Sequence, residues 1–344
     1  MAITEKDIQD RFFETYNRDK SRYVKKWLVS WDYQVKRRKR KVNYGTEQPA
    51  DFEKYNGAED LVKWMNWFPK NYTNYLPLNL VSPLVEASRE MDKKIITALN
   101  LQFDFTNYEN RIGLNNAHDY IFPELYPVPE RNKIRNILDF GAGFGRQANL
   151  WARNSTNIYL ALDAIPKSYC LQHLYFSNIG RPFYDYINSP EGFSINSEKS
   201  GIYHLPTWRY DLLPDNFFDM VMAVQVLREL NSKLLRKMIN QFHRILKPGA
   251  ILYIRDHGDK WKPAGKMNID NFLISHGFVL EFKPHIILDA DLHGIPRIWR
   301  KTDERVVNSQ KPDFKAKLRS LAEDADAFSG GILRKVIGQK RSNG

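Results

Sequence analysis

Cysteine is almost absent from this sequence, because Cys170 is the only one among 344 residues. A single cysteine excludes an internal disulfide and is typical of a protein from a reducing compartment. The opening residues, MAITEKDIQD, contain no apolar core of the kind that secretory signals carry. No uninterrupted apolar run reaches the roughly 18 residues that suggest a membrane span. These absences predict a cytoplasmic protein with no membrane partner.

Acidic residues are fewer than basic ones, with 40 Asp and Glu against 52 Lys and Arg, which gives a formal net charge of +12. Such an excess favours polyanionic partners but does not require them. The densest basic run, KRRKRK, consists of Lys36, Arg37, Arg38, Lys39, Arg40 and Lys41. Aromatic residues flank this run, and nucleic-acid bases stack on aromatic side chains. The run therefore has two interpretations, a nucleic-acid contact and a solvated helix face.

The sequence up to residue 131 spaces its aromatic and apolar residues at helical intervals. One or two helices are expected between Glu5 and about Arg40. Another is expected in SPLVEASREMDKKIITALN, where Ser82 can cap the helix and Pro83 fits its first turn. We expect this helical extension to cover an acceptor site, although packing between helices is the simpler explanation for any one aromatic. The candidate walls of that site are Trp64, Trp67 and Tyr75.

Short apolar runs alternate with amphipathic stretches from residue 132 to residue 302. The runs NILDF, IYLALD, FDMVMAVQV and AILYIRD predict strands, and NSKLLRKMINQFHRIL predicts a helix. Strands that alternate with helices of this length are typical of a parallel, doubly wound α/β sheet. Residues 303–344 predict a basic helix and a loose tail.

Three glycines occupy alternate positions directly after the first predicted strand. Gly141, Gly143 and Gly145 follow NILDF, and Asp139 stands two residues before the first of them. Glycine accepts a positive φ and lets a ligand approach the main chain, so this turn predicts a cofactor site. Dinucleotide sites usually have the spacing G-x-G-x-x-G, whereas the spacing here is G-x-G-x-G. An acidic neighbour repels a pyrophosphate but suits a ligand that carries a cationic amine.

Four ordered motifs resemble those of class I S-adenosylmethionine (SAM)-dependent methyltransferases. LDFGAGFGR resembles the first motif, ALDAIP the second-strand motif, NFFDMVMAVQVLREL the fourth-strand motif, and RILKPGAILYI the segment that leads into the fifth strand. The resemblance covers roughly residues 132–302. It implies a Rossmann-like, doubly wound sheet of seven strands, here with a helical N-terminal extension, and SAM as the cofactor.

The resemblance assigns roles to the residues of these motifs. Asp163 would hold the ribose hydroxyls with both oxygens, Asp139 would receive the ammonium, and the glycines would admit the methionine portion of SAM. The implied cofactor-binding residues are Asp139, Gly141, Ala142, Gly143, Gly145, Arg146, Asp163, Ala164 and Gln225. More narrowly, YHLPTWRYDLLPDNFFDMVMAVQVLREL and IPKSYCLQHLYFS are similar to sugar O-methyltransferases of bacterial glycan and natural-product pathways.

Candidate catalytic residues follow the strands, because ligands lie over the carboxyl ends of a parallel sheet. His257 is the first candidate for a general base, with Asp256 as its orienter or alternate, and His293 is the second. Glu229 is a candidate for substrate or cofactor contact, and capping of the next helix explains it as well. Asp256 and His257 could instead bind a metal with Glu229 or His293, but no ligand spacing here is diagnostic, and we predict no metal.

The sequence thus predicts a SAM-dependent O-methyltransferase that acts on a small-molecule hydroxyl by in-line transfer. An RNA ribose or cap methyltransferase that uses the basic run is the main alternative. The sequence shows no zinc-cluster motif and no Asn-Pro-Pro-type motif after the fourth strand, and the lysine-centred tetrad of such enzymes is not recognisable. A non-catalytic SAM-binding subunit that docks a partner is the second alternative.

Overall fold

The computed structural model describes residues 5–23, 55–68, 72–74, 76–125, 134–153, 157–227, 230, 232–256, 269–284 and 294–302. The basic run at 36–41, Tyr75 and the predicted tail at 303–344 lie outside these ranges. Among the described helices, none is both long enough and apolar enough to cross a membrane.

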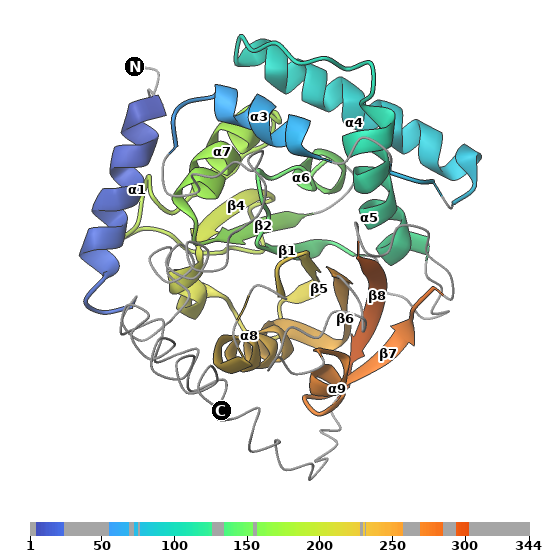
Figure 1. Ribbon diagram of the computed structural model, residues 1–344. Helices are drawn as coiled ribbons and strands as arrows, with labels where there is room; N and C mark the ends of the chain where they lie inside the picture. The colour runs from blue at the N-terminus through green and yellow to red at the C-terminus, as the bar shows by residue number, and fades with distance from the viewer. Residues whose placement is uncertain are drawn as a thin grey trace, which may run out of the picture.

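Helices precede the sheet, and strands then alternate with helices along the chain (Figure 1). The N-terminal helices are α1 (Glu5–Asp19), α3 (Glu59–Trp67), α4 (Leu78–Ala98), the π-helix η2 (Glu109–Gly113) and α5 (Leu114–Leu125). The alternating part contains β1 (Asn136–Phe140), α6 (Ala148–Trp151), β2 (Ile158–Asp163), α7 (Pro166–Ser177), β3 (Phe183–Asp185), β4 (Gly201–Pro206) and the 3-10 helix η3 (Thr207–Leu212). It continues with β5 (Phe218–Val224), α8 (Ser232–Ile245), β6 (Leu246–Asp256), α9 (Ile269–Ile274), β7 (Phe278–Phe282) and β8 (Ile295–Lys301).

The strands form one sheet in the order β3-β4-β2-β1-β5-β6-β8-β7. The pairs from β3 to β6 are parallel, whereas β8 runs antiparallel to both β6 and β7. The α/β class and the doubly wound arrangement are confirmed, but the prediction of seven strands is wrong, since the described residues form eight. The additional edge strand, β3, has three residues and is too short to show an alternating pattern.

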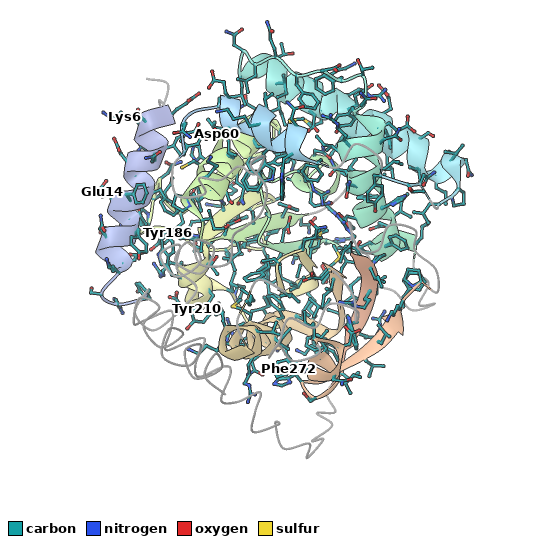
Figure 2. All side chains as sticks on the ribbon, viewed as in Figure 1. Lys6, Glu14, Asp60, Tyr186, Tyr210 and Phe272 are labelled. Atoms are coloured by element: carbon teal, nitrogen blue, oxygen red, sulfur yellow. The ribbon has the colours of Figure 1, made fainter. Side chains whose placement is uncertain are left out.

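Each face of the sheet packs against its own layer of helices. Leu138 and Leu160 belong to the hydrophobic cluster that includes α8 and α9, whereas Ile137 and Tyr159 belong to the cluster that includes α1, α3 and α7. This division follows from the strand geometry, because successive side chains point to opposite faces. Figure 1 shows α8 and α9 on one side of the sheet and α3, α6 and α7 on the other, and Figure 2 shows the side chains that fill both layers.

Helix α4 begins earlier than its sequence predicts. It starts at Leu78 rather than at a Ser82 cap, and Pro83 lies inside it. A proline in the second turn removes a single helical hydrogen bond and is tolerated there more easily than at mid-helix. Helix α4 packs along α5, which also contacts α6 and β8, so the N-terminal helices are part of the layer over the glycine turn.

Candidate active site

A cavity lies at the carboxyl ends of β1, β2 and β5 and is roofed by α3. Ligands of open α/β sheets bind at this edge. Its floor comes from the strand ends and the glycine turn, and its roof is aromatic. The lining residues are Trp64, Trp67, Phe68, Asp139, Phe140, Gly141, Ala142, Gly143, Arg146, Gln147, Leu162, Asp163, Ala164, Ile165, Ser168, Thr207, Val224, Gln225, Val226 and Leu230.

The glycine turn supplies the open part of this floor. Gly143 has a φ of +64°, and a Cβ placed on it would meet nothing nearer than the Trp64 ring at 3.9 Å. A Cβ on Gly141 would lie 2.5 Å from Val226, and one on Gly145 would lie 2.6 Å from Phe176. Gly143 therefore leaves room for a ligand, while the other two glycines are required by the packing of the turn.

Asp139 lies at the bottom of the cavity with a buried carboxyl group. It is 2% exposed and accepts a hydrogen bond from the Tyr159 hydroxyl at 2.5 Å. Burial raises the pKa of Asp139 to about 7, although the Tyr159 hydroxyl and the charge of Arg146 act in the opposite direction. A ligand cation placed at this carboxyl group would favour its ionised form.

Asp163 ends β2 and faces the cavity from the opposite side of the glycine turn. Its Oδ1 accepts the backbone N–H groups of Ala164 and Ile165 at 2.7 and 3.0 Å. Its Oδ2 accepts the Gln172 Nε2 at 3.1 Å, and the same amide nitrogen donates to the Gly143 carbonyl at 2.8 Å. Gln172 therefore joins the acidic end of β2 to the open glycine of the turn.

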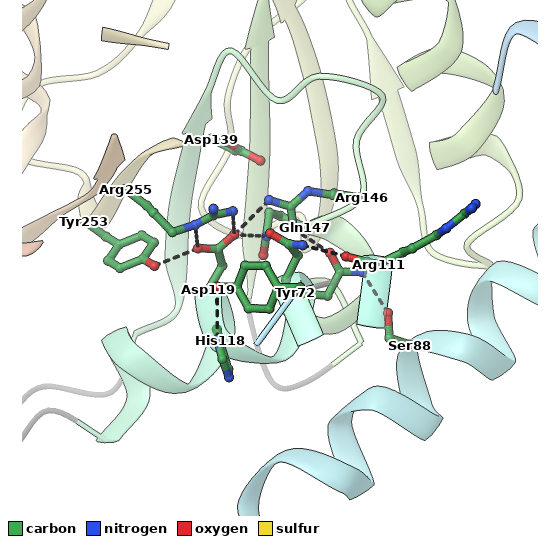
Figure 3. A network of polar contacts seen from close by, with 12 residues as sticks. Tyr72, Ser88, Arg111, His118, Asp119, Asp139, Arg146, Gln147, Tyr253 and Arg255 are labelled. Atoms are coloured by element: carbon green, nitrogen blue, oxygen red, sulfur yellow. Dashed lines mark hydrogen bonds and ion pairs between the residues drawn. The ribbon is translucent and has the colours of Figure 1, made fainter. Parts of the chain in front are cut away.

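A buried carboxylate on α5, Asp119, gathers five donors beside the cavity (Figure 3). Arg255 donates from Nε and Nη2 at 2.6 and 2.8 Å, and Arg146 donates at 2.8 Å. Gln147 and the Tyr253 hydroxyl complete the set at 2.9 and 2.7 Å. Burial alone would raise the pKa of Asp119, but the two guanidinium charges outweigh burial and hold that pKa well below its usual range.

This arrangement leaves one positive charge in excess, since two arginines share one carboxylate. Arg146 is the member that lines the cavity, where its guanidinium also lies 5.4 Å from the centre of the Phe68 ring. Arg255 is 1% exposed and lies behind it. Together with Asp139, the cavity thus offers an acid and a guanidinium to a ligand that carries charges of both signs.

The backbone at the carboxyl end of β5 is strained. Gln225 has a φ of +55°, which is uncommon for a residue with a side chain, and its N–H donates to the Arg255 carbonyl at 2.7 Å. Such conformations gather at functional sites, where the surrounding structure enforces them. Gln225, the residue with this strained conformation, lines the cavity.

The cavity collects eight of the nine residues predicted to bind the cofactor. Gly145 is the exception, because it packs on Phe176 instead. Of the predicted catalytic residues, Asp256 is fully buried at the end of β6 and does not line the cavity. Glu229, His257 and His293 lie outside the described residues.

The sequence analysis did not identify Asp119 or Gln172. Both lie on helices and hydrogen-bond to residues that line the cavity. Asp119 belongs to a helix that precedes the sheet, in a stretch where Asn115, Asn116 and His118 are also buried. The sequence feature that could have indicated Asp119 is this run of polar residues within an otherwise apolar helix. Gln172 shares α7 with buried apolar residues, and nothing in its neighbourhood distinguishes it.

Comparison with known proteins agrees with this geometry. Residues 138–254 match a family described as a methyltransferase domain. This segment runs from β1 to β6 and contains the glycine turn, Asp163 and Gln225. The chain carries a class I SAM-dependent methyltransferase domain.

Individual proteins similar to the methyltransferase domain differ in their acceptors. The tRNA N(3)-cytidine methyltransferase METTL2 of Danio rerio is 28% identical over 147 residues, which cover 43% of this chain and 36% of that protein. The N-methyltransferase NodS of Bradyrhizobium japonicum, solved with S-adenosylhomocysteine, is 13% identical, with a TM-score of 0.40, and the match covers 62% of this chain and 98% of NodS. The phosphoethanolamine N-methyltransferase 1 of Haemonchus contortus is 12% identical, with a TM-score of 0.41, over 74% of this chain and 57% of that one.

Proposed function

We propose that this protein transfers a methyl group from SAM to a hydroxyl group of a small molecule, of the sugar or natural-product kind. The observation that carries the proposal is that one cavity is lined by the glycine turn, by two acids and by an aromatic roof. The acceptor oxygen attacks the methyl carbon in line with the carbon–sulfur bond. That bond breaks to give S-adenosylhomocysteine, and a base takes the hydroxyl proton.

The cofactor end of the cavity fits the charges of SAM. In the proposed arrangement Asp139 receives the ammonium, Asp163 holds the ribose hydroxyls, and Gly143 leaves space for the methionine portion. Arg146 is suitably charged for the SAM carboxylate. Gly141, Ala142, Ala164 and Gln225 contribute the surrounding wall.

The aromatic roof supports a small organic acceptor. Trp64 is 8% exposed, whereas Trp67 is 47% exposed at the same cavity. A half-exposed indole offers a flat apolar face, on which the C–H groups of a sugar ring or an apolar acceptor can lie. The resemblance of the fourth-strand region to sugar O-methyltransferases points to the same class of acceptor.

The base of the proposed reaction is His257, with Asp256 as the residue that orients it. His257 follows the last residue of β6, and β6 pairs with β5, the strand that leads to Gln225. A positioned histidine contributes on the order of 10²- to 10⁴-fold to proton removal. His293 is the second candidate for the base, and Glu229 is a candidate for substrate or cofactor contact.

The test is a comparison of His257→Ala with the wild-type protein in turnover and in SAM affinity. Because the base acts only on the acceptor, we expect turnover to fall about 10²-fold or more while the calorimetric SAM affinity stays the same. His276→Ala serves as the matched control, since His276 lies after α9, away from the cavity. Equal losses in turnover and affinity, or no loss at all, would remove His257 from this role.

RNA is the second candidate acceptor, supported by the similarity to a tRNA N(3)-cytidine methyltransferase and by the basic run at 36–41. Methyl-labelled SAM, incubated with the protein and a desalted or undesalted lysate of its host, separates the two. Label in the small-molecule fraction, unaffected by ribonuclease, supports the sugar or natural-product acceptor. Label in macromolecules that ribonuclease degrades supports RNA, and label in neither supports a subunit that binds SAM without transferring the methyl group.

A further inference from the structure

Two histidines and an aspartate meet at the edge of the sheet, outside the cavity. His173 comes from α7, Asp185 ends the edge strand β3, and His204 lies in β4. The three are 5%, 4% and 0% exposed. One nitrogen from each histidine and one carboxylate oxygen all lie within 4.8 Å of one another.

The contacts between these three side chains converge on one oxygen. His173 Nδ1 lies 2.5 Å from Asp185 Oδ2, and His204 Nδ1 lies 3.1 Å from the same oxygen. The other oxygen, Oδ1, accepts the Tyr169 hydroxyl at 2.6 Å and the Ile187 N–H at 3.1 Å. The carboxylate is therefore held from behind, with Oδ2 directed at the two imidazoles.

The hydrogen bonds of Gln172 determine which nitrogen of His204 carries a proton. The Gln172 Nε2 donates to two acceptors, the Gly143 carbonyl and the Asp163 carboxylate. The orientation of this amide is thereby fixed, and its Oε1 faces His204 Nε2 at 2.9 Å. That nitrogen must donate, so a neutral His204 presents the lone pair of Nδ1 to the lone pairs of Asp185 Oδ2.

Two facing acceptors repel each other unless a second proton on His204 or a metal cation lies between them. The surroundings have the features of a metal centre, where one nitrogen of a ligating histidine binds the metal while the other donates to a nearby carbonyl or carboxylate oxygen. Here His204 donates to the Gln172 amide, and Asp185 is supported by Tyr169 and a main-chain amide. The Tyr169 ring also stacks on the His204 ring, with the ring centres 3.7 Å apart, which fixes the imidazole plane.

We propose that His173 Nδ1, His204 Nδ1 and Asp185 Oδ2 bind a divalent transition-metal ion of the zinc class. Two imidazoles and a carboxylate are a usual donor set for such an ion, with bonds of about 2.0–2.2 Å. An ion between them would open the contacts that now measure 2.5 and 3.1 Å. The ion ties α7 to the edge strands β3 and β4 and neutralises the buried carboxylate.

The metal site also reaches the cofactor cavity through one residue. Gln172 contacts His204 on one side and both Asp163 and the Gly143 carbonyl on the other. An ion in the metal site would hold the His204 ring that this amide contacts, which couples the metal site to the ribose-binding acid. This consequence rests on the proposed function, whereas metal binding itself does not.

The experiment measures metal uptake by the full-length protein, purified without a metal-affinity step and stripped with a chelator. Zinc or cobalt(II) is added alone, excess is removed, and the content is read by elemental mass spectrometry. We expect one ion per wild-type chain, with visible cobalt(II) absorption bands from a site that contains nitrogen ligands. Asp185→Asn and His204→Gln should retain less than about a tenth of this content, whereas His276→Gln, outside the cluster, should retain all of it.

Two results would overturn the proposal. A folded wild-type chain that takes up no stoichiometric zinc or cobalt would show that a second proton on His204, rather than a metal, separates the facing acceptors. Full uptake by folded Asp185→Asn or His204→Gln would place the ion elsewhere. If both variants unfold, His173→Gln at the rim of the cluster replaces them. SAM affinity is measured separately, so failure of the cofactor site would not be mistaken for failure of the metal site.

Discussion

The two faces of the central strands bury very different side chains. Toward α8, β1, β2 and β4 contribute Leu138, Phe140, Ile158, Leu160, Leu162 and Leu205. Toward α3 and α7 the same strands contribute Ile137, Ala161 and Ile202 and, between them, Asp139, Tyr159, Asp163 and His204, all less than 10% exposed. The strands therefore supply an apolar layer on one face and, on the other, a layer that mixes apolar residues with buried polar groups, here called the polar layer.

The difference separates stability from recognition. Burial of apolar area stabilises the fold whatever the orientation of the side chains. Each buried polar group, in contrast, costs free energy unless it is hydrogen-bonded. The polar layer meets this requirement with networks around Asp119, Asp163 and Asp185. We therefore expect substitutions toward α8 to change mainly the free energy of unfolding, and substitutions at the cavity to change mainly ligand binding.

Asp119→Asn is the substitution with the largest expected effect on stability and the clearest exception to that division. It leaves Arg255 and Arg146 buried without a carboxylate, so the free energy of unfolding should fall by about 3–5 kcal/mol, as measured by urea denaturation. Asp104→Asn is the control, because Asp104 is a solvated carboxylate and its loss should leave the midpoint nearly unchanged. A small effect of Asp119→Asn would show that the arginines do not depend on it.

Leu160→Ala tests the apolar layer alone. Leu160 is fully buried at the centre of β2, and the cavity left by its truncation should lower the free energy of unfolding by about 3 kcal/mol. The SAM affinity of the folded protein should stay the same, since the side chain points away from the cofactor cavity. Val279→Ala, on an exposed position of the edge strand β7, is the matched control. A SAM affinity that changes with Leu160→Ala would contradict the separation of the two layers.

Most residues of the cavity floor could be predicted from the sequence, because their positions depend on local rules. A glycine turn after the first strand and an acid at the end of the second are fixed by neighbours in the sequence. Eight of the predicted residues accordingly line the cavity. The alternation of strands and helices likewise predicted the doubly wound sheet, but neither β3 nor β4 was among the strands expected from the sequence.

The polar networks were not predictable, because they join residues far apart in the sequence. Asp119 and Arg255 are separated by 136 positions, and His173 and His204 by 31, so no local spacing reveals either pair. Their partners are decided by which helix covers which strand.

The start of α4 was also misplaced, because Pro83 is accommodated inside the helix rather than at its first turn.

Asp163→Ala should affect binding more than stability, in contrast to Leu160→Ala. Hydrogen bonds to a charged group contribute about 1.5–3 kcal/mol each, so loss of the ribose contacts should weaken SAM binding by about 2 kcal/mol, or roughly 30-fold. Isothermal titration calorimetry measures this change. Asp163→Asn, which keeps an acceptor for the Ala164 and Ile165 N–H groups, separates support of the turn from binding. An unchanged affinity in Asp163→Ala would remove SAM from the proposed position.

The smallest expected effect is a pH dependence of SAM binding that comes from Asp139. Its pKa is about 7 in the free protein, because burial favours the protonated form, and a bound ammonium would require the ionised form. Binding must therefore release a proton below pH 7, and affinity should fall about eightfold between pH 7.5 and pH 6 by proton linkage. Asp139→Asn should bind SAM more weakly at pH 7.5 but with a flat profile over this range. A wild-type affinity that is equally flat would show that the ammonium is held elsewhere, and Asp139 would then belong with the structural part of the polar layer.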